Sequence, residues 1–131
     1  MQAHVTAITL AVKDLVLGKA FYTGKFGWQT LAENEKVIML KLDNLVLTLC
    51  DELLFAAYTN ISNNAGSNRF YLTINLASKA DVDAKIAQLR QAEVQILKHP
   101  AETFWGGYAG FIADPEGNCW EICYNPFVAG G

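Results

Sequence analysis

The sequence of 131 residues contains no cluster of basic residues, no long apolar run and no recognisable leader segment. Its ten lysines and arginines are scattered singly among thirteen acidic residues, so no surface is expected to neutralise the phosphates of a nucleic acid. The apolar runs are too short and too interrupted to cross a bilayer. We therefore expect neither nucleic-acid nor membrane partners. Because no basic segment followed by an apolar core opens the chain, we expect a cytoplasmic protein.

Cysteine is scarce, and its spacing argues against disulfides. Three cysteines, Cys50, Cys119 and Cys123, cannot all pair, and four residues along a strand would hold Cys119 and Cys123 roughly 13 Å apart. A soft-metal or redox cluster is one interpretation, but no CxxC spacing is present. We favour free thiols that act as small buried hydrophobes in a reducing compartment.

Histidine, the commonest metal ligand, occurs only twice. His4 lies at the wrong parity of its strand to face a site with the residues that follow. His99 is expected in a loop before Phe104 and Trp105. Both positions favour surface or loop histidines over metal ligands.

Apolar residues are abundant enough for one folded domain. They make up 52% of the chain, against 18% charged residues, which excludes an extended disordered protein. A chain of this length buries about two-thirds of its unfolded surface on folding. A single soluble globular domain is therefore expected.

The first half of the chain predicts one helix among strands. Asp14 is placed to cap a helix that ends near Gly27, because apolar residues follow it on one helical face. The predicted strands are Ile8–Val12, Trp28–Glu33, Lys36–Asp43 and Leu45–Cys50.

The second half repeats this order after a connector at Asp51–Arg69, whose Asn, Gly and Ser content favours turns. Ser78 and Asp81 form a capping box, and apolar residues then recur at helical spacing. A type I turn is predicted at Asp114–Gly117. The predicted strands are Phe70–Leu76, Val94–Leu97, Trp105–Ala113 and Asn118–Tyr124.

The two halves align as an internal duplication. Ile8 and Thr9 align with Leu72 and Thr73, and Leu49 and Cys50 align with Ile122 and Cys123. The expected fold is α+β, with two βαβββ modules whose mixed sheets enclose a cavity and whose helices lie outside. Module 1 spans about 5–52, the connector about 53–69 and module 2 about 70–126. Clefts between repeated modules are natural small-molecule sites.

Two motifs give the sequence a resemblance to the vicinal oxygen chelate superfamily, which includes glyoxalase I, bleomycin-resistance proteins and extradiol dioxygenases. The first is ITLAVKDL followed by FY and FGW, and the second is GGYAGFIADPEGN followed by WE and NP. The resemblance covers nearly the whole chain. It implies two βαβββ modules around a cavity and, as an expectation, a homodimer.

The resemblance also locates the positions that bind metal in some members of the family, on the first and last strand of each module. These positions are Ala7, Thr48, Tyr71 and Glu121. Ala7 has no donor atom, and a Thr hydroxyl and a Tyr phenol are poor substitutes for imidazole or carboxylate. We therefore expect no metal site and no cofactor.

Glu121 is the one acid at these positions, and the period of a strand places other residues beside it. Cys119 and Cys123 share its face, Thr9 accompanies Ala7, and Thr73 accompanies Tyr71. Glu121 either orients the strands through a neighbouring hydroxyl or acts as an acid, base or hydrogen-bond acceptor. Phe104, Trp105 and Tyr108 either stack on a flat ligand or close a sheet edge. The candidate ligand-binding residues are Thr9, Thr48, Tyr71, Thr73, Phe104, Trp105, Tyr108 and Glu121.

We interpret the protein as one that binds or sequesters a small organic molecule, as the bleomycin-resistance members of the family do, without the metal. Two alternatives stay open. One is a metal-dependent glyoxalase-like lyase or isomerase, or an extradiol-type dioxygenase, which would need a divalent metal and has Glu121 as its candidate catalytic residue. The other is a non-catalytic interaction module with a vestigial cavity.

Overall fold

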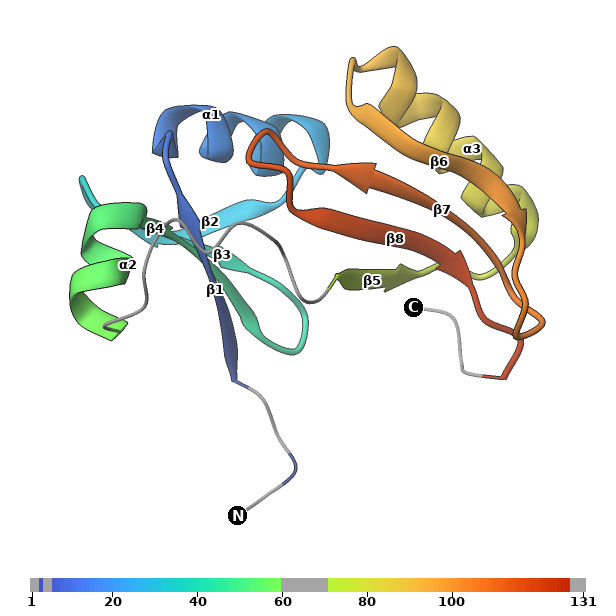
Figure 1. Ribbon diagram of the computed structural model, residues 1–131, viewed down its shortest axis with the longest axis horizontal. Helices are drawn as coiled ribbons and strands as arrows, with labels where there is room; N and C mark the ends of the chain where they lie inside the picture. Colours follow the sequence, from blue (N-terminus) through green and yellow to red (C-terminus); the bar gives the residue numbers. More distant parts are fainter. Residues whose placement is uncertain (1–2, 4–5, 60–70, 128–131) are drawn as a thin grey trace. The chain divides into compact units, whose positions relative to one another are not determined.

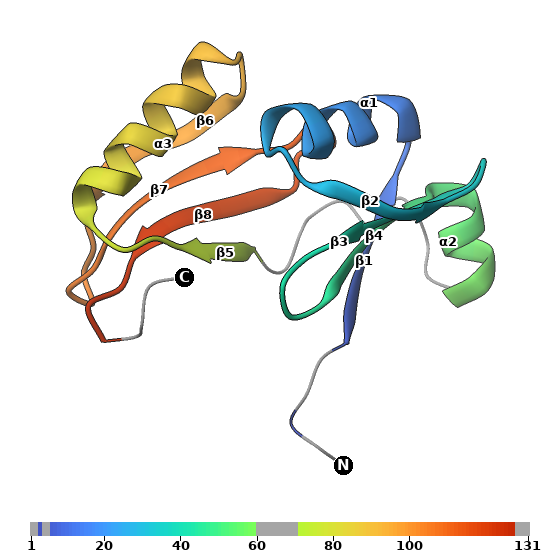
Figure 2. The same cartoon turned by 180° about the vertical axis from the view of Figure 1, so that it is seen from behind.

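The computed structural model describes residues 3, 6–59 and 71–127. The chain divides into two compact units, residues 1–66 (unit 1) and 67–131 (unit 2). Each unit contains one four-stranded mixed sheet and its own helices, as Figures 1 and 2 show from opposite sides. No helix in the described part of the chain is long and apolar enough to span a membrane.

Unit 1 has its strands in the order β1-β4-β3-β2. Strands β1 and β4 are parallel, and the other neighbours are antiparallel. The elements in chain order are β1 (Ala7–Val12), α1 (Leu15–Ala20), the π-helical turn η1 (Phe21–Lys25), β2 (Gln29–Glu33), β3 (Val37–Lys41), β4 (Val46–Asp51) and α2 (Glu52–Thr59).

The first helix begins as the sequence predicts. The side chain of Asp14 accepts a hydrogen bond from the backbone N–H of Leu17 at 2.9 Å, which satisfies one of the donors that a helix N-terminus leaves unpaired. The helix then widens into η1, where the N–H of Phe26 donates to the carbonyl of Phe21. The fully buried Tyr22 ring stacks on Trp28 at a centroid distance of 6.0 Å, and this aromatic packing anchors the end of the helix.

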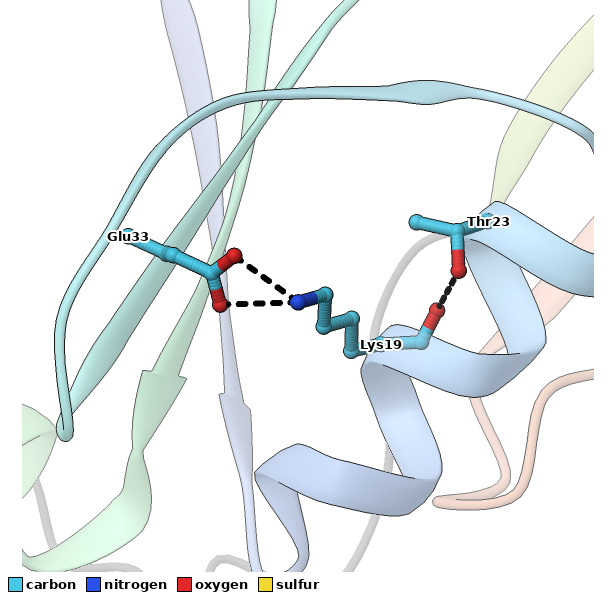
Figure 3. A network of polar contacts seen from close by, with 3 residues as sticks. All are labelled: Lys19, Thr23 and Glu33. Atoms are coloured by element: carbon cyan, nitrogen blue, oxygen red, sulfur yellow. Dashed lines mark hydrogen bonds and ion pairs between the residues drawn. The ribbon is translucent and has the colours of Figure 1, made fainter.

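A polar contact at the surface joins this helix to β2 (Figure 3). The ammonium of Lys19 lies 2.8 and 3.0 Å from the two carboxylate oxygens of Glu33, and the hydroxyl of Thr23 donates to the Lys19 carbonyl at 2.7 Å. Both charged side chains are well exposed, so this pair contributes little to stability.

Unit 2 has its strands in the order β5-β8-β7-β6, again with the first pair parallel. Ser78 caps the helix as predicted, accepting from the N–H of Asp81 at 3.1 Å. Val82, Ile86 and Leu89 form its buried face. The elements are β5 (Leu72–Asn75), α3 (Lys79–Gln91), β6 (Gln95–Glu102), β7 (Tyr108–Ala113) and β8 (Cys119–Tyr124).

The predicted turn at Asp114–Gly117 joins β7 to β8. The N–H of Gly117 donates to the Asp114 carbonyl at 3.0 Å, and Gly117 has a φ of +84°, a conformation that glycine adopts without strain. The buried Asp114 carboxylate accepts hydrogen bonds from the N–H groups of Glu116 and Asn118, which stabilises the turn.

Strand register confirms the predicted duplication. Thr48 of β4 pairs with Thr9 on one side and Met39 on the other, and Glu121 of β8 pairs with Thr73 and Phe111 in the same way. The antiparallel strand pairs β2·β3 and β6·β7 also share a register shift. In β2·β3 it lies next to the residue pair that contains Met39, and in β6·β7 next to the residue pair that contains Phe111. The α+β fold with two βαβββ modules is therefore confirmed.

The structure differs from the sequence-based expectations at the connector, at His99 and at the start of the strand predicted from Trp105. That strand, β7, begins only at Tyr108, because residues 104–106 form a turn. Residues 52–59 form helix α2, where the sequence analysis predicts a connector rich in turns, and the later residues 60–70 of that connector lie outside the described residues. His99 lies on strand β6, so its assignment to a loop is wrong, although it is exposed as expected. His4 lies outside the described residues.

Candidate functional site

The sheet of unit 1 has one face against α1 and an opposite face that carries the predicted site residues. A Cβ placed on Gly18 of α1 would lie 3.3 Å from the Leu49 side chain, so α1 packs on the face of Leu49. Because side chains alternate along a strand, Thr48 and Cys50 of β4 point to the opposite face, together with Thr9 of β1. We call this surface the open face of unit 1.

Helix α2 and the open face of unit 1 form a pocket of about 360 Å³. That volume lies within the ~300–1,000 Å³ typical of small-molecule sites. The sheet contributes the hydroxyls of Thr9 and Thr48, and the helix contributes apolar and aromatic side chains. The pocket is lined by Thr9, Val37, Thr48, Cys50, Leu54, Phe55 and Tyr58. It therefore combines an apolar wall with a few polar groups at its base.

Helix α2 is held in place by the end of β4. One carboxylate oxygen of Asp51 accepts hydrogen bonds from the N–H groups of Leu53 and Leu54, each at 3.2 Å. The three α2 residues of the pocket, Leu54, Phe55 and Tyr58, are not among the candidate residues predicted from the sequence. An acid that can cap a helix, followed by the helix-favouring residues ELLFAAY, is the signal that could have identified them.

The sheet of unit 2 also has one face against its helix. A Cβ on Gly110, which pairs with Ile122, would lie 3.2 Å from the Ile86 side chain of α3. Ile122 and Trp120 therefore face α3, and Glu121 points to the opposite side. We call the opposite side the open face of unit 2.

Glu121 lies on this open face and is only 6% exposed. Its Oε1 accepts a hydrogen bond from the hydroxyl of Thr73 at 2.9 Å. Tyr71 and Phe111 form an edge-to-face pair beside it, with ring centroids 5.6 Å apart. The structure thus brings three predicted residues, Tyr71, Thr73 and Glu121, onto one surface.

The two thiols on the same strand face as Glu121 are poor nucleophiles. Burial, and secondarily the negative charge of Glu121, raises the pKa of Cys119, and the same causes raise the pKa of Cys123 to about 11. Burial, and secondarily the charge of Asp51, also raises the pKa of Cys50. All three cysteines are unpaired. Because their pKa values are raised, the three thiols stay protonated at neutral pH. Their role as space-filling groups stays a prediction.

The residues at the four family metal positions do not fit a divalent ion. Ala7 has no donor, Thr48 offers only a hydroxyl and Tyr71 only a phenol. One oxygen of Glu121 already accepts a hydrogen bond from Thr73. Among the described residues, no three His, Cys, Asp or Glu side chains are grouped so that they could hold a metal ion. The prediction of a metal-free protein rests on this donor chemistry and stays a prediction.

The predicted aromatic residues Phe104, Trp105 and Tyr108 lie in the turn before β7 and at its first residue. Tyr108 lies on the α3 side of its sheet, where its hydroxyl donates to Asp83 at 2.6 Å. This hydrogen bond, followed by desolvation, raises the pKa of Tyr108. The Trp105 ring packs directly over Gly107, and Phe104 is fully exposed. Tyr108 thus lies on the opposite face of the sheet from Glu121. The role of all three residues as ligand contacts stays a prediction.

Residues 2–122 match the sequence profile of the Glyoxalase/Bleomycin resistance protein/Dioxygenase superfamily. This match covers most of the chain, and the duplicated βαβββ units agree with it. The protein belongs to this superfamily. Among curated proteins, none is significantly similar to the chain.

Several solved structures share the fold. A glyoxalase-related enzyme from Fulvimarina pelagi is 27% identical over 95% of this chain and 90% of that chain, with a TM-score of 0.87. A glyoxalase/bleomycin resistance protein/dioxygenase from Nocardioides is 21% identical over 100% of this chain and 89% of that one, with a TM-score of 0.83. A lactoylglutathione lyase from Agrobacterium tumefaciens is 22% identical over 100% of both chains, with a TM-score of 0.79. The last two likenesses show the fold alone.

Proposed function

We propose that the protein binds a small organic molecule in the pocket between α2 and the open face of unit 1, and does so without a metal. The observation that carries the proposal is the pocket itself, about 360 Å³ with mainly apolar walls and the hydroxyls of Thr9 and Thr48 at its base. Such a lining suits a largely apolar, planar compound with one polar group that exchanges a hydrogen bond with a hydroxyl. Sequestration of that compound would resemble the bleomycin-resistance members of the family.

A thermal-shift screen with planar aromatic and glycopeptide-like compounds tests the proposal, because a ligand that binds the folded state raises the melting temperature. Helix α2 offers a matched pair of variants. Leu54 lines the pocket, whereas its neighbour Leu53, which is the more exposed of the two, does not. Leu54→Ala should weaken binding and Leu53→Ala should leave it unchanged. Equal effects of the two variants, or no shift with any compound, would contradict the proposal.

A second candidate function is catalysis, and the buried Glu121 favours it. A carboxylate that is 6% exposed and hydrogen-bonded to Thr73 is held in a fixed orientation, as a general base requires. The likeness to the glyoxalase-related enzyme from Fulvimarina pelagi points the same way. The metal-dependent form of this candidate, a lyase, isomerase or dioxygenase, is tested by metal analysis of protein purified without chelators. Stoichiometric nickel, zinc, iron or manganese that is lost in Glu121→Ala would favour it over binding.

Assembly and location belong to the same proposal. We expect a homodimer, since the family resemblance implies one, and light scattering should then report twice the 14.4 kDa chain mass. A cytoplasmic location is supported by the three unpaired thiols, which suit a reducing compartment. If the pocket binds no compound and Glu121 supports no reaction, the remaining alternative is a non-catalytic interaction module.

A further inference from the structure

Glu121 has a buried carboxyl group that forms no ion pair with a described residue. Its side chain is 6% exposed. The ion pairs among the described residues join Lys19 to Glu33 and Lys79 to Glu102, and neither involves Glu121. A buried ionised carboxylate is normally paired with a cation, because losing its hydration without compensation is costly. This imbalance points to a cation that is supplied from outside the described residues.

One of the two carboxylate oxygens of Glu121 is open to such a partner. Thr73 donates to Oε1, whereas no described residue donates to Oε2. In the described part of the chain, no fully buried side-chain oxygen lacks a hydrogen-bond partner. Oε2 is therefore not completely enclosed by the protein.

The surroundings of Glu121 suit an organic cation better than a metal ion. A divalent ion requires several oxygen, nitrogen or sulfur donors, and no described group of His, Cys, Asp and Glu supplies them. Tyr71 and Phe111 instead present aromatic rings beside the carboxylate, and Phe111 pairs directly with Glu121 across the sheet. Aromatic faces attract ammonium groups and pack against their apolar substituents.

Among the described residues of unit 2, no basic side chain forms an ion pair with Glu121. Lys98 pairs with Phe111, so the strand of Phe111 lies between Lys98 and Glu121, and no ion pair joins the two charged residues within 4.0 Å. Arg69 precedes Tyr71 by two positions and lies outside the described residues. A variant of Arg69 therefore belongs in the test.

We propose that the open face of unit 2 binds a protonated amine carried on an apolar or aromatic body. Oε2 of Glu121 accepts a charge-assisted hydrogen bond from the ammonium, Thr73 holds the carboxylate through Oε1, and Tyr71 and Phe111 contact the apolar body. The site lies in a different unit from the pocket at α2 and uses none of its residues. Its success or failure is therefore measured separately from that of the proposed function.

Isothermal titration with benzylammonium and with neutral benzyl alcohol tests the proposal on the full chain. The wild-type protein should bind benzylammonium and discriminate against benzyl alcohol. Glu121→Gln should weaken benzylammonium binding about tenfold or more, the loss expected for a charge-assisted hydrogen bond. Glu93→Gln makes the same charge change at an exposed position of unit 2 and should have no effect. Tyr71→Leu should weaken binding of benzylammonium by a smaller factor.

The melting temperature of Glu121→Gln shows whether this variant is folded. Gln keeps an oxygen acceptor for Thr73 and removes a buried charge, so Glu121→Gln should melt no lower than the wild type. Equal binding of the alcohol and the amine, or unchanged amine binding by Glu121→Gln, would overturn the proposal. Binding of benzylammonium by Arg69→Gln but not by the wild type would also overturn the proposal, because Arg69 would then be the cation that pairs with Glu121. Stabilisation of the wild type, but not of Glu121→Gln, by Mn²⁺ alone would overturn it in favour of a metal.

Discussion

Equivalent positions of the two sheets carry side chains of different chemistry. Register places Thr48 in unit 1 where Glu121 lies in unit 2, with Thr9 and Thr73 as their respective neighbours on the parallel strand. A hydroxyl is neutral and can both donate and accept hydrogen bonds. A buried carboxylate only accepts them, and its negative charge needs a partner that replaces the lost hydration. At this position the duplication has therefore produced a neutral side chain in unit 1 and an acidic one in unit 2.

Cys123 should make the protein less stable at alkaline pH. Burial and the charge of Glu121 raise the pKa of its thiol from 9.0 to about 11 in the folded state. A group with a raised pKa stabilises the fold fully below its unfolded pKa and loses that contribution as the pH rises through the folded value. The free energy of unfolding, measured with urea, should therefore fall between about pH 9 and pH 11.

Cys123→Ala isolates this effect from the other groups that titrate in the same range. The variant should be less stable than the wild type at pH 8, because it loses a buried side chain. The difference between the two proteins should then narrow from about pH 9 to pH 11. If the difference stays constant with pH, the pKa of the Cys123 thiol is not higher in the folded state than in the unfolded state, and the prediction is wrong.

At the scale of elements, helix α2 depends on Asp51, which closes its N-terminus. Asp51→Ala removes the acceptor for the N–H groups of Leu53 and Leu54 and should cost about 0.5–2 kcal/mol of stability. The loss should be local, so amide hydrogen exchange should quicken in 52–59 more than elsewhere. Because α2 supplies one wall of the pocket, ligand affinity should fall as well.

Asp51→Asn is the matched control for this prediction. Asparagine is as good an N-cap as aspartate and lacks only the charge, so it should keep most of the stability and slow the exchange to the wild-type rate. If alanine and asparagine behave alike, charge and not the capping hydrogen bond holds the helix.

The turn between β6 and β7 requires glycine at position 107. The Trp105 ring packs where a Cβ on Gly107 would lie, and the Gly107 N–H donates to the Thr103 hydroxyl at 2.7 Å. Gly107→Ala should displace the indole and cost about 1–3 kcal/mol, as overpacking usually does. A Cβ on Gly24 of η1 would meet no atom within 4 Å, so Gly24→Ala should instead stabilise the protein by about 0.4–1 kcal/mol.

Thermal denaturation and tryptophan fluorescence check this pair. The emission of Trp105 should shift to longer wavelength in Gly107→Ala and stay unchanged in Gly24→Ala. Equal melting temperatures of the two variants would mean that the ring moves aside without loss of packing.

The elements that the sequence predicts well are those with a local signal. Asp14 and Ser78 cap helices because their side chains reach the N–H three residues ahead, and Gly117 closes a turn that needs a positive φ. Helix α2 is missed because the Asn- and Ser-rich residues that follow it outweigh its own helix-favouring residues in the pattern. The predicted strand before His99 ends too early because an alternating pattern is weak at an edge.

For the whole molecule, duplication explains why part of the site could be predicted. Aligning the halves correctly matched Thr9 with Thr73 and Thr48 with Glu121, because the strand pairs Thr9–Thr48 and Thr73–Glu121 take the same place in the two sheets. The contribution of α2 to the pocket could not be predicted in this way, because α2 lies outside the repeat of strands. The side of the sheet that Tyr108 occupies does follow from parity, since Tyr108 lies three residues before Phe111, the strand partner of Glu121. Its hydrogen bond with Asp83 has no such signal in the sequence.

Two separate ligand effects are the expectation for the whole chain. A pocket ligand and benzylammonium should each raise the melting temperature, and at a concentration 100 times its Kd each should add about 2.7 kcal/mol. Phe55→Ala removes a wall of the pocket and should abolish the first shift while sparing the second. Glu121→Gln should do the reverse. Loss of both shifts in either variant would mean that the two ligands depend on one site, and the assignment of one site to each unit would then be wrong.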